Sequence, residues 1–225
     1  MSVKPMTGRT VTIAKALAGP GKGCVLCPRL AAFIDSYREA NPDWHNAPVP
    51  AFGDGDAWLL IVGLAPGLKG ANRTGRPFTG DGAGDLLYPT LVNFNLAEGV
   101  YDKRPDDGLK LKGVRITNAV RCVPPENKPT GLEARTCRPF LLDEMAALKN
   151  LKVLLALGKI AHDAILSTFD LRKVDYKFAH AAQHTLPNGL ILADSYHCSR
   201  YNVNTGRLTP AMFADVFKGL EQEVK

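Results

Sequence analysis

The chain has 225 residues, of which 45% are hydrophobic, with a formal net charge of +6 and an isoelectric point near 9.1. This length suffices for one well-packed domain, so we expect a single domain over 1–225 that opens with an irregular arm over 1–23. No apolar run is long enough to cross a membrane, and the N-terminal residues lack the apolar core of a secretory signal. These patterns predict a cytoplasmic, monomeric protein with no membrane contact. The mild positive charge favours an anionic partner.

Apolar runs and helical periodicity predict strands that alternate with helices. The expected strands cover 58–62, 114–120, 152–158 and 190–193, and the expected helices cover 29–39, 85–95, 132–149, 159–169 and 210–223. This alternation predicts an α/β fold, a three-layer α/β/α domain with a central, mainly four-stranded parallel sheet. Ligands of such folds bind beyond the carboxyl ends of the strands. We therefore expect one site from the residues at or just past four strand ends, Gly63, Asn118, Gly158 and His197.

A long loop rich in Gly and Pro follows the first predicted strand, with the sequence GLAPGLKGANRTGRPFTGDGAGD over 63–85. Glycines let backbone amides approach a ligand, arginines suit phosphate, and Phe78 offers a flat face for a nucleobase. The combination favours a binding loop over a surface loop without function. A phosphate-cradling nucleotide enzyme is a weaker interpretation, because neither G-x4-G-K-[ST] nor G-x-G-x-x-G is present.

Four of the five cysteines have the arrangement of metal ligands. Cys24 and Cys27 form a C-x2-C pair, and Cys122 and Cys137 follow in two other segments. Thiolates in a cytoplasmic protein hold either a tetrahedral zinc ion or an iron–sulfur cluster, and their spacing does not choose between the two. Cys198 stands apart, and we do not expect it to be a fifth ligand.

Four motifs together resemble the uracil-DNA glycosylases. GLAPG and GANRTGRPFTGD lie in the long loop, and ITNAVRC and HCSRYN follow in the same order as in that superfamily. The resemblance covers about 24–209 and is nearest to the iron–sulfur family 5, or type B, enzymes, because the similar family 4 enzymes typically carry an acidic residue at the position of Leu64. It implies a hydrolase of DNA base-excision repair that flips uracil out of DNA and cleaves its N-glycosidic bond, leaving an abasic site.

Two further expectations come from the same resemblance. The four cysteines Cys24, Cys27, Cys122 and Cys137 correspond to the ligands of a structural [4Fe-4S] cluster, whereas Cys198 replaces a family Pro. Family 5 enzymes also resemble broad deamination-repair enzymes that accept hypoxanthine and xanthine, so we expect Leu64 to relax base selection.

The resemblance also implies the residues that bind the base. Phe78 matches an aromatic residue that stacks on the flipped base, and Asn118 matches the Asn whose amide hydrogen-bonds to the base edge. His197 matches a His that donates toward O2, where negative charge develops. The expected base-binding set is completed by three loop residues, Gly63, Ala65 and Gly67.

The residue that positions water is less evident from the motifs. Other families place Asp or Asn at the position of Ala65, which cannot polarise water. By the family 5 pattern we expect a downstream polar residue of the same loop, Asn72, with Asp81 as the rival carboxylate. The predicted catalytic set is Asn72, Asn118 and His197. Lys69 stands where many relatives have His, and we assign it no role.

Two segments are expected to contact DNA. Arg73 and Arg76 suit phosphates, and the segment after His197 lies where relatives insert a wedge into the duplex, with the residues Arg200, Tyr201 and Asn202. The alternative function is a catalytically weak iron–sulfur DNA-binding module of the same fold, suggested by Ala65 and Cys198. Excision of uracil from an oligonucleotide distinguishes the two.

Overall fold

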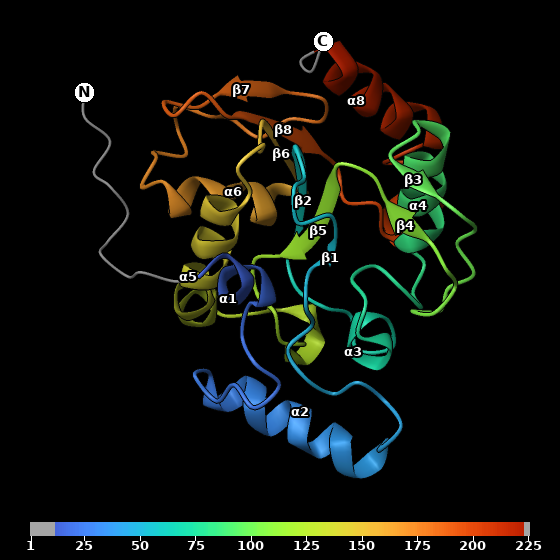
Figure 1. Cartoon of the computed structure of the whole chain (residues 1–225), viewed down its shortest axis with the longest axis vertical. Helices are drawn as coiled ribbons and strands as arrows, with labels where there is room; N and C mark the ends of the chain where they lie inside the picture. Colours follow the sequence, from blue (N-terminus) through green and yellow to red (C-terminus); the bar gives the residue numbers. More distant parts are fainter. Residues whose placement is uncertain (1–11, 223–225) are drawn as a thin grey trace.

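A six-stranded sheet forms the centre of the protein, which is described over residues 12–222 by a computed structural model (Figure 1). Its strand order is β1-β5-β2-β6-β8-β7. The bounds are β1 Phe52–Gly53, β2 Leu59–Gly63, β5 Val114–Asn118, β6 Val153–Leu157, β7 Gln183–Thr185 and β8 Ile191–Ser195. The four central strands, β5, β2, β6 and β8, are parallel, whereas β1 and β7 pair antiparallel at the edges.

The predicted α/β class and the four parallel strands are confirmed. Each residue of β2, β5 and β6 is buried. This explains why β2 and β6 appear in the sequence as continuous apolar runs, whereas β5 also buries the polar residues Arg115, Thr117 and Asn118. The edge strands β1 and β7 were not predicted, because two or three residues carry no periodic signal. Register places Gly63 of β2 beside Asn118 of β5, so these two strands end at the same edge.

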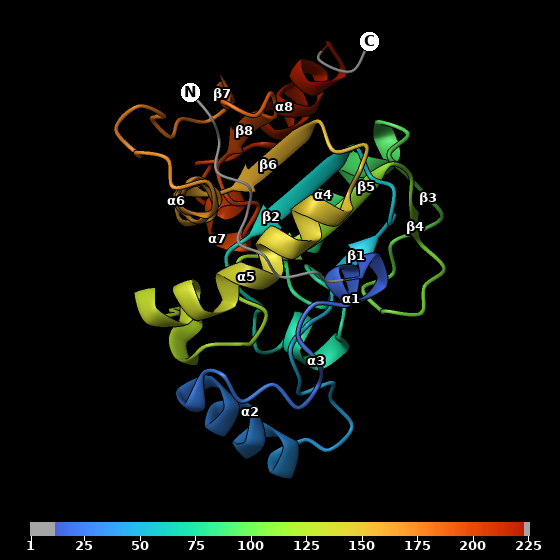
Figure 2. The ribbon, with the colours of Figure 1, turned by 60° about the vertical axis from the view of Figure 1, so that its left-hand side comes forward.

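Helices cover both faces of the sheet (Figures 1 and 2). On one face α4 (Gly84–Asn93) and α8 (Pro210–Gln222) contribute to a core with Leu87, Phe213 and Phe217. On the other face α5 (Gly131–Ala147) and α6 (Lys159–Thr168) contribute Leu141 and Ile165. A third, smaller core lies between α2 (Pro28–Ala40), α5 and the segment after β5. All five expected helices are present, with ends displaced by two residues at most.

Several short elements were not predicted. They are α1 (Ile13–Ala18), α3 (Ala71–Thr74), α7 (Arg200–Asn204), a 3₁₀ turn over Pro125–Asn127, and the hairpin of β3 (Ala97–Glu98) and β4 (Lys110–Leu111). The helix α1 corrects the expectation of an irregular arm, at least from residue 12 onward. The Thr12 side chain caps it by accepting from the Lys15 amide, and Arg115 donates to the Leu17 carbonyl at 2.7 Å. The first eleven residues of the predicted arm lie outside the described residues.

Over residues 12–222, no helix combines the length and the apolar character needed to cross a membrane.

Candidate active site and cysteine cavity

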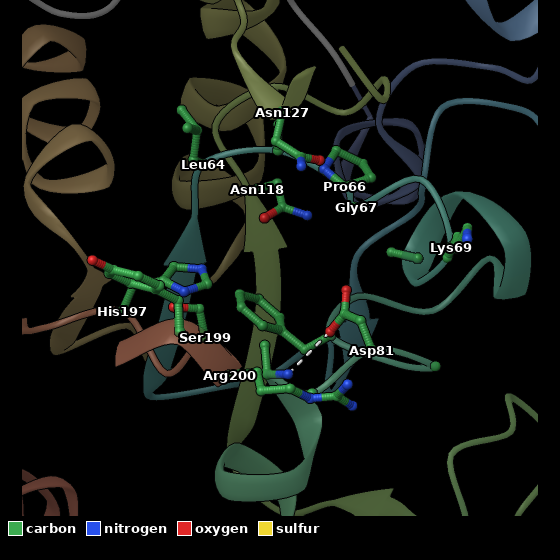
Figure 3. A pocket seen from close by; sticks show the side chains of 17 residues that line it. Leu64, Pro66, Gly67, Lys69, Asp81, Asn118, Asn127, His197, Ser199 and Arg200 are labelled. Carbon is green, nitrogen blue, oxygen red and sulfur yellow. Dashed lines mark hydrogen bonds between the residues drawn. The ribbon is translucent and has the colours of Figure 1, made fainter. Parts of the chain in front are cut away.

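A cavity of about 600 Å³ lies at the carboxyl edge of the sheet (Figure 3). Its walls come from the loop after β2, the end of β5, the loop after β5, the loop after β8 and the start of α7. Asn118, Asp81 and His197 approach the same space from three sides in Figure 3. The rule for ligand sites in parallel sheets therefore holds here, although Gly158 is not among the lining residues.

Gly63 allows the close packing beneath this cavity. A Cβ atom at this position would lie 2.4 Å from Asn118 Oδ1 and 2.6 Å from Phe78 Cζ, both well inside contact distance. Gly63 itself does not line the cavity. Its hydrogen side chain lets the Asn118 amide and the Phe78 ring reach their positions, so it acts as a support below the predicted base-binding residues.

Phe78 and His197 form one wall together. Their ring centroids are 5.9 Å apart at an interplanar angle of 34°. Phe78 has a positive φ of 52°, unusual for a non-glycine residue, and the Tyr101 hydroxyl donates to its carbonyl at 3.2 Å. Burial lowers the pKa of His197 below its usual value, although the nearby Asp81 charge opposes this shift. His197 is therefore a neutral imidazole at pH 7, with one N–H available to donate.

Asn118 presents an uncommitted amide to the cavity. The residue is 4% exposed, and its side chain forms no hydrogen bond with any other residue in the described part of the chain. Its polar atoms are not among the fully enclosed side-chain atoms that lack a partner, so they are accessible from the cavity that the residue lines. The Asn118 amide is thus a free donor and acceptor at the carboxyl end of β5 (Figure 3).

Asp81 is the carboxylate of this cavity. Its Oδ1 accepts from the Ala83 amide at 3.1 Å, the bond drawn in Figure 3. Its Oδ2 lies against the turn after β2, where a Cβ atom on Gly70 would come within 2.1 Å of it and one on Gly67 within 2.8 Å. Gly67 thus lines the cavity and leaves room for the Asp81 carboxylate, whereas Ala65 lines it with only a methyl group.

Asn72, the predicted water-positioning residue, does not line the cavity. The short helix α3 turns its side chain inward, where it is fully buried. Its Nδ2 donates to Asn46 Oδ1 at 2.9 Å, and its Oδ1 has no partner among the described residues. The geometry therefore does not support direct contact between Asn72 and a substrate. The rival carboxylate Asp81 does face the cavity.

Arg76 is also placed differently from its prediction as a DNA contact. Its side chain is 4% exposed and donates two hydrogen bonds to Asp107, at 2.7 and 2.6 Å. The guanidinium also lies over the rings of Phe52, Tyr88 and Tyr101. This enclosed cation is committed to the interior and cannot reach a phosphate.

The segment after β8 divides into exposed and supporting residues. Arg200 and Tyr201 line the cavity mouth, and Tyr201 is 72% exposed. Asn202 instead donates from Nδ2 to the His197 carbonyl at 2.8 Å, and its backbone amide donates to the Ser199 side chain at 3.3 Å. Asn202 therefore orients the His197 backbone, and its predicted contact with DNA stays a prediction. Arg73 is exposed, and its Nη2 donates to the Gly80 carbonyl at 3.3 Å.

Three polar lining residues were not among the predicted site residues. Lys69 is exposed at the rim, Ser199 caps α7, and Asn127 enters from the loop after β5 with a positive φ of 56° (Figure 3). The sequence around Asn127 shows only a Pro-rich turn. Its placement depends on how that turn folds over the edge of the sheet.

The four predicted ligand cysteines line one small cavity, with Leu30, Val120 and Phe140 among its apolar neighbours. Burial, followed by the neighbouring thiols, raises the pKa of Cys122 to about 12. The Arg121 amide donates to Cys137 Sγ at 3.4 Å, as an amide does to a ligating sulfur. As placed, no three His, Cys, Asp or Glu side chains within 12–222 form a group able to hold a metal ion. The donor set nevertheless fits a metal or cluster that prefers thiolates.

Cys198 is separate from this cavity. It is fully buried in the core that α4 and α8 build against the sheet, where burial raises its pKa to about 12. As expected, it does not belong to the cysteine group.

Comparison with known proteins places the chain in a family. Residues 50–221 match the model of the uracil DNA glycosylase superfamily. A type-5 uracil-DNA glycosylase of Thermus thermophilus is 48% identical over 200 residues, covering 86% of this chain and 90% of that protein. One from Mycobacterium leprae is 40% identical over 87% of this chain and 89% of its own length. A type-4 uracil-DNA glycosylase of Pyrobaculum aerophilum is 33% identical over 67% of this chain and 63% of its length.

The type-5 relatives match more of the chain, at higher identity, than this type-4 relative. Leu64 also indicates the type-5 enzymes, because it lines the cavity at the position where the family 4 motif has an acidic residue. The chain belongs to the uracil DNA glycosylase superfamily, within its type-5 family.

Proposed function

We propose that this chain is a monofunctional DNA-repair glycosylase that hydrolyses the N-glycosidic bond of uracil in DNA and leaves an abasic site. One observation carries the proposal. An aromatic ring, a free buried amide, a neutral imidazole and a carboxylate surround a single cavity, from Phe78, Asn118, His197 and Asp81. These are the groups that excision of a flipped base requires.

The base-binding step uses the wall and floor of the cavity. The flipped uracil stacks on Phe78, and the Asn118 amide donates to and accepts from its polar edge. As the bond to the sugar breaks, negative charge develops on the departing base. The neutral His197 donates its N–H to that charge, and it needs no change of protonation to do so because burial has already lowered its pKa.

For the water we propose Asp81 in place of Asn72. Asp81 lines the cavity and is held by the Ala83 amide, so its remaining oxygen lone pairs are available to orient a water molecule. A carboxylate also accepts a proton, which a neutral amide does not. Asn72 then has a supporting role, because its contact with Asn46 joins α3 to the segment after α2.

The proposal extends to other deaminated bases, hypoxanthine and xanthine. The lining residues Leu64 and Ala65 carry neither charge nor hydrogen-bonding side-chain atoms that would oppose a different base edge. A cavity of about 600 Å³ also has room for a purine ring system.

We further propose that Cys24, Cys27, Cys122 and Cys137 hold a [4Fe-4S] cluster. When bound, the cluster supplies cross-links between chain segments and no chemistry to base excision. The cysteine cavity and the candidate active site have no lining residue in common, which supports this structural role.

The alternative, a DNA-binding module with little turnover, rested on Ala65 and Cys198. Asp81 provides a carboxylate at the cavity and Cys198 packs in the core, which supports the enzyme over this alternative.

The test uses a duplex oligonucleotide with one uracil, treated with alkali after incubation to cleave at abasic sites. We expect cleavage at the uracil, with parallel substrates that contain hypoxanthine or xanthine. A duplex with thymine is the control for specificity. Binding to the uracil duplex with no abasic site formed would refute the enzyme and favour the alternative.

A further inference from the structure

A second cavity, of about 290 Å³, lies between α5 and α6. The two helices pack side by side in both ribbon views (Figures 1 and 2). Leu64 lines this cavity and the candidate active site, so the two hollows adjoin across the start of the loop after β2. We call the second cavity the α5–α6 groove. None of its residues has a part in the base excision derived above except Leu64.

The rim of the α5–α6 groove is basic. Arg135 and Arg138, three residues apart and so on one face of α5, line it and form no ion pair or side-chain hydrogen bond with any of the residues 12–222. On the opposite side, Lys173 lines the groove and binds Asp163 at 3.2 Å. Lys159, which does not line the groove, binds the same carboxylate at 2.9 Å. Three lining cations, Arg135, Arg138 and Lys173, against the one lining carboxylate, Asp163, leave a formal charge of +2.

The two arginines have no partner among the described residues and lie across the groove from Lys173. They suit phosphate, because the planar guanidinium group can donate two parallel hydrogen bonds to two phosphate oxygens. The floor is apolar, with Ala119, Leu141 and Ala164, and accommodates the sugar face of a nucleotide. Each nucleotide of an extended DNA strand presents both a phosphate and an apolar sugar face. Because the groove adjoins the candidate active site, the strand that it would bind is the one that contains the damaged base.

We propose that the α5–α6 groove binds the backbone of the DNA strand that contains the damaged base, on one side of the flipped nucleotide. The inference rests on the proposed function, since it takes the adjoining cavity as the base pocket. It assigns Arg135 and Arg138 as phosphate contacts that position the strand. The helix α7, with Arg200 and Tyr201 exposed at the mouth of the first cavity, then meets the duplex at the flipped site.

The test compares two double variants that each remove two positive charges. R135A/R138A removes the groove arginines. K149A/K152A is the matched control, because both lysines are exposed between α5 and β6, at the amino edge of the sheet opposite the site. Neither lysine forms a side-chain hydrogen bond or ion pair within the described residues. R135K/R138K retains the charge and should recover most of the loss.

The readout is binding of a fluorescent duplex without uracil between about 50 and 200 mM salt, the range over which phosphate contacts dominate. R135A/R138A should flatten the log–log salt dependence by about two units and weaken binding by about 10- to 100-fold near 0.1 M salt. The control should keep the wild-type slope. Arg135→Ala alone, at an exposed position, should flatten the salt dependence of binding by about one unit. This single variant is included because Arg138→Ala could disturb the adjacent Cys137.

Excision from the uracil duplex is measured in parallel. The enzyme concentration for half-maximal excision should rise for R135A/R138A and stay at the wild-type value for K149A/K152A. If R135A/R138A keeps the wild-type salt dependence of DNA binding and still excises uracil, the proposal that the groove binds DNA is refuted and the proposed function stands. An inactive wild type whose slope still depends on the two arginines would refute the glycosylase and retain a DNA-binding groove.

Discussion

At the scale of single residues, neighbouring residues hold three side chains of the candidate site in position. Gly63 leaves room for the Asn118 amide, Asn202 holds the His197 carbonyl, and Tyr101 holds the carbonyl of Phe78. Groups fixed in this way need no reorganisation when charge develops on the base.

His197→Ala and Asn118→Ala should each lower single-turnover excision of uracil by about 100-fold or more, the loss typical of one preorganised donor. Single-turnover kinetics exclude product release from the comparison. Thermal unfolding of each variant controls for misfolding. Wild-type rates in both variants would refute the assignment of this cavity as the active site, even in a working glycosylase.

Asp81 and Asn72 give opposite expectations. Asp81→Ala should lower the single-turnover rate by about 100-fold or more if its carboxylate orients the water. Asn72→Ala removes the buried bond to Asn46, so it should lower the unfolding temperature while the folded fraction excises uracil at nearly the wild-type rate. A rate lost in Asn72→Ala and kept in Asp81→Ala would restore the original assignment.

At the scale of elements, the loop after β2 is held by a buried ion pair. Arg76, within the loop, pairs with Asp107 in the segment between β3 and β4, and both side chains are almost fully enclosed. The hydrogen bonds from Arg76 hold the pKa of Asp107 down to about 2. The loop that carries Phe78 and Asp81 is therefore fixed to the hairpin.

This pair predicts a pH dependence of stability. The pKa of Asp107 is depressed in the folded state, so its contribution is complete above the unfolded value of about 4 and is lost as pH falls toward 2. A shift of nearly two units corresponds to about 2.5 kcal/mol. Denaturant unfolding of wild-type protein and Asp107→Asn, from pH 7 down to pH 2, should show this loss only in the wild type.

At pH 7, Asp107→Asn leaves the Arg76 charge enclosed without a partner and should cost about 3–5 kcal/mol of unfolding free energy. Asp102→Asn is the control, because Asp102 pairs with Arg104 on the exposed surface and should cost less than about 1 kcal/mol. Equal effects of the two variants would contradict the buried role of Arg76.

At the scale of the whole molecule, the cysteine cavity joins parts of the chain that are far apart in sequence. Cys24 and Cys27 precede α2, Cys122 follows β5, and Cys137 lies in α5. A cluster held there would fasten α2 to the rest of the domain, in addition to the small third core and the ion pair of Arg29 with Glu133 of α5.

The purified protein should be brown, with about four iron atoms per chain, as a cubane cluster requires. Cys122→Ser should lower iron content and the unfolding temperature. The control Cys198→Ser should retain full iron content, because Cys198 lies in a different core. A colourless protein that contains one zinc ion per chain would refute the cluster and indicate a tetrahedral zinc site.

Most of the fold followed from the sequence by itself. Long apolar runs specify buried parallel strands, since each residue of such a strand faces a covered side, and the amphipathic patterns between them specify helices. The motifs also indicated the family, the grouping of four cysteines, and the residues Phe78, Asn118 and His197 at the cavity.

Only the tertiary structure decided which polar residues of the motifs face the cavity. Arg76 and Asn72 lie in the same loop as Phe78 and Asp81, yet the turn of α3 and the distant Asp107 draw them inward. The α5–α6 groove and Asn127 likewise depend on segments that meet only after folding. A side chain's partners are set by contacts across the chain, and in an irregular loop no sequence period reports its direction.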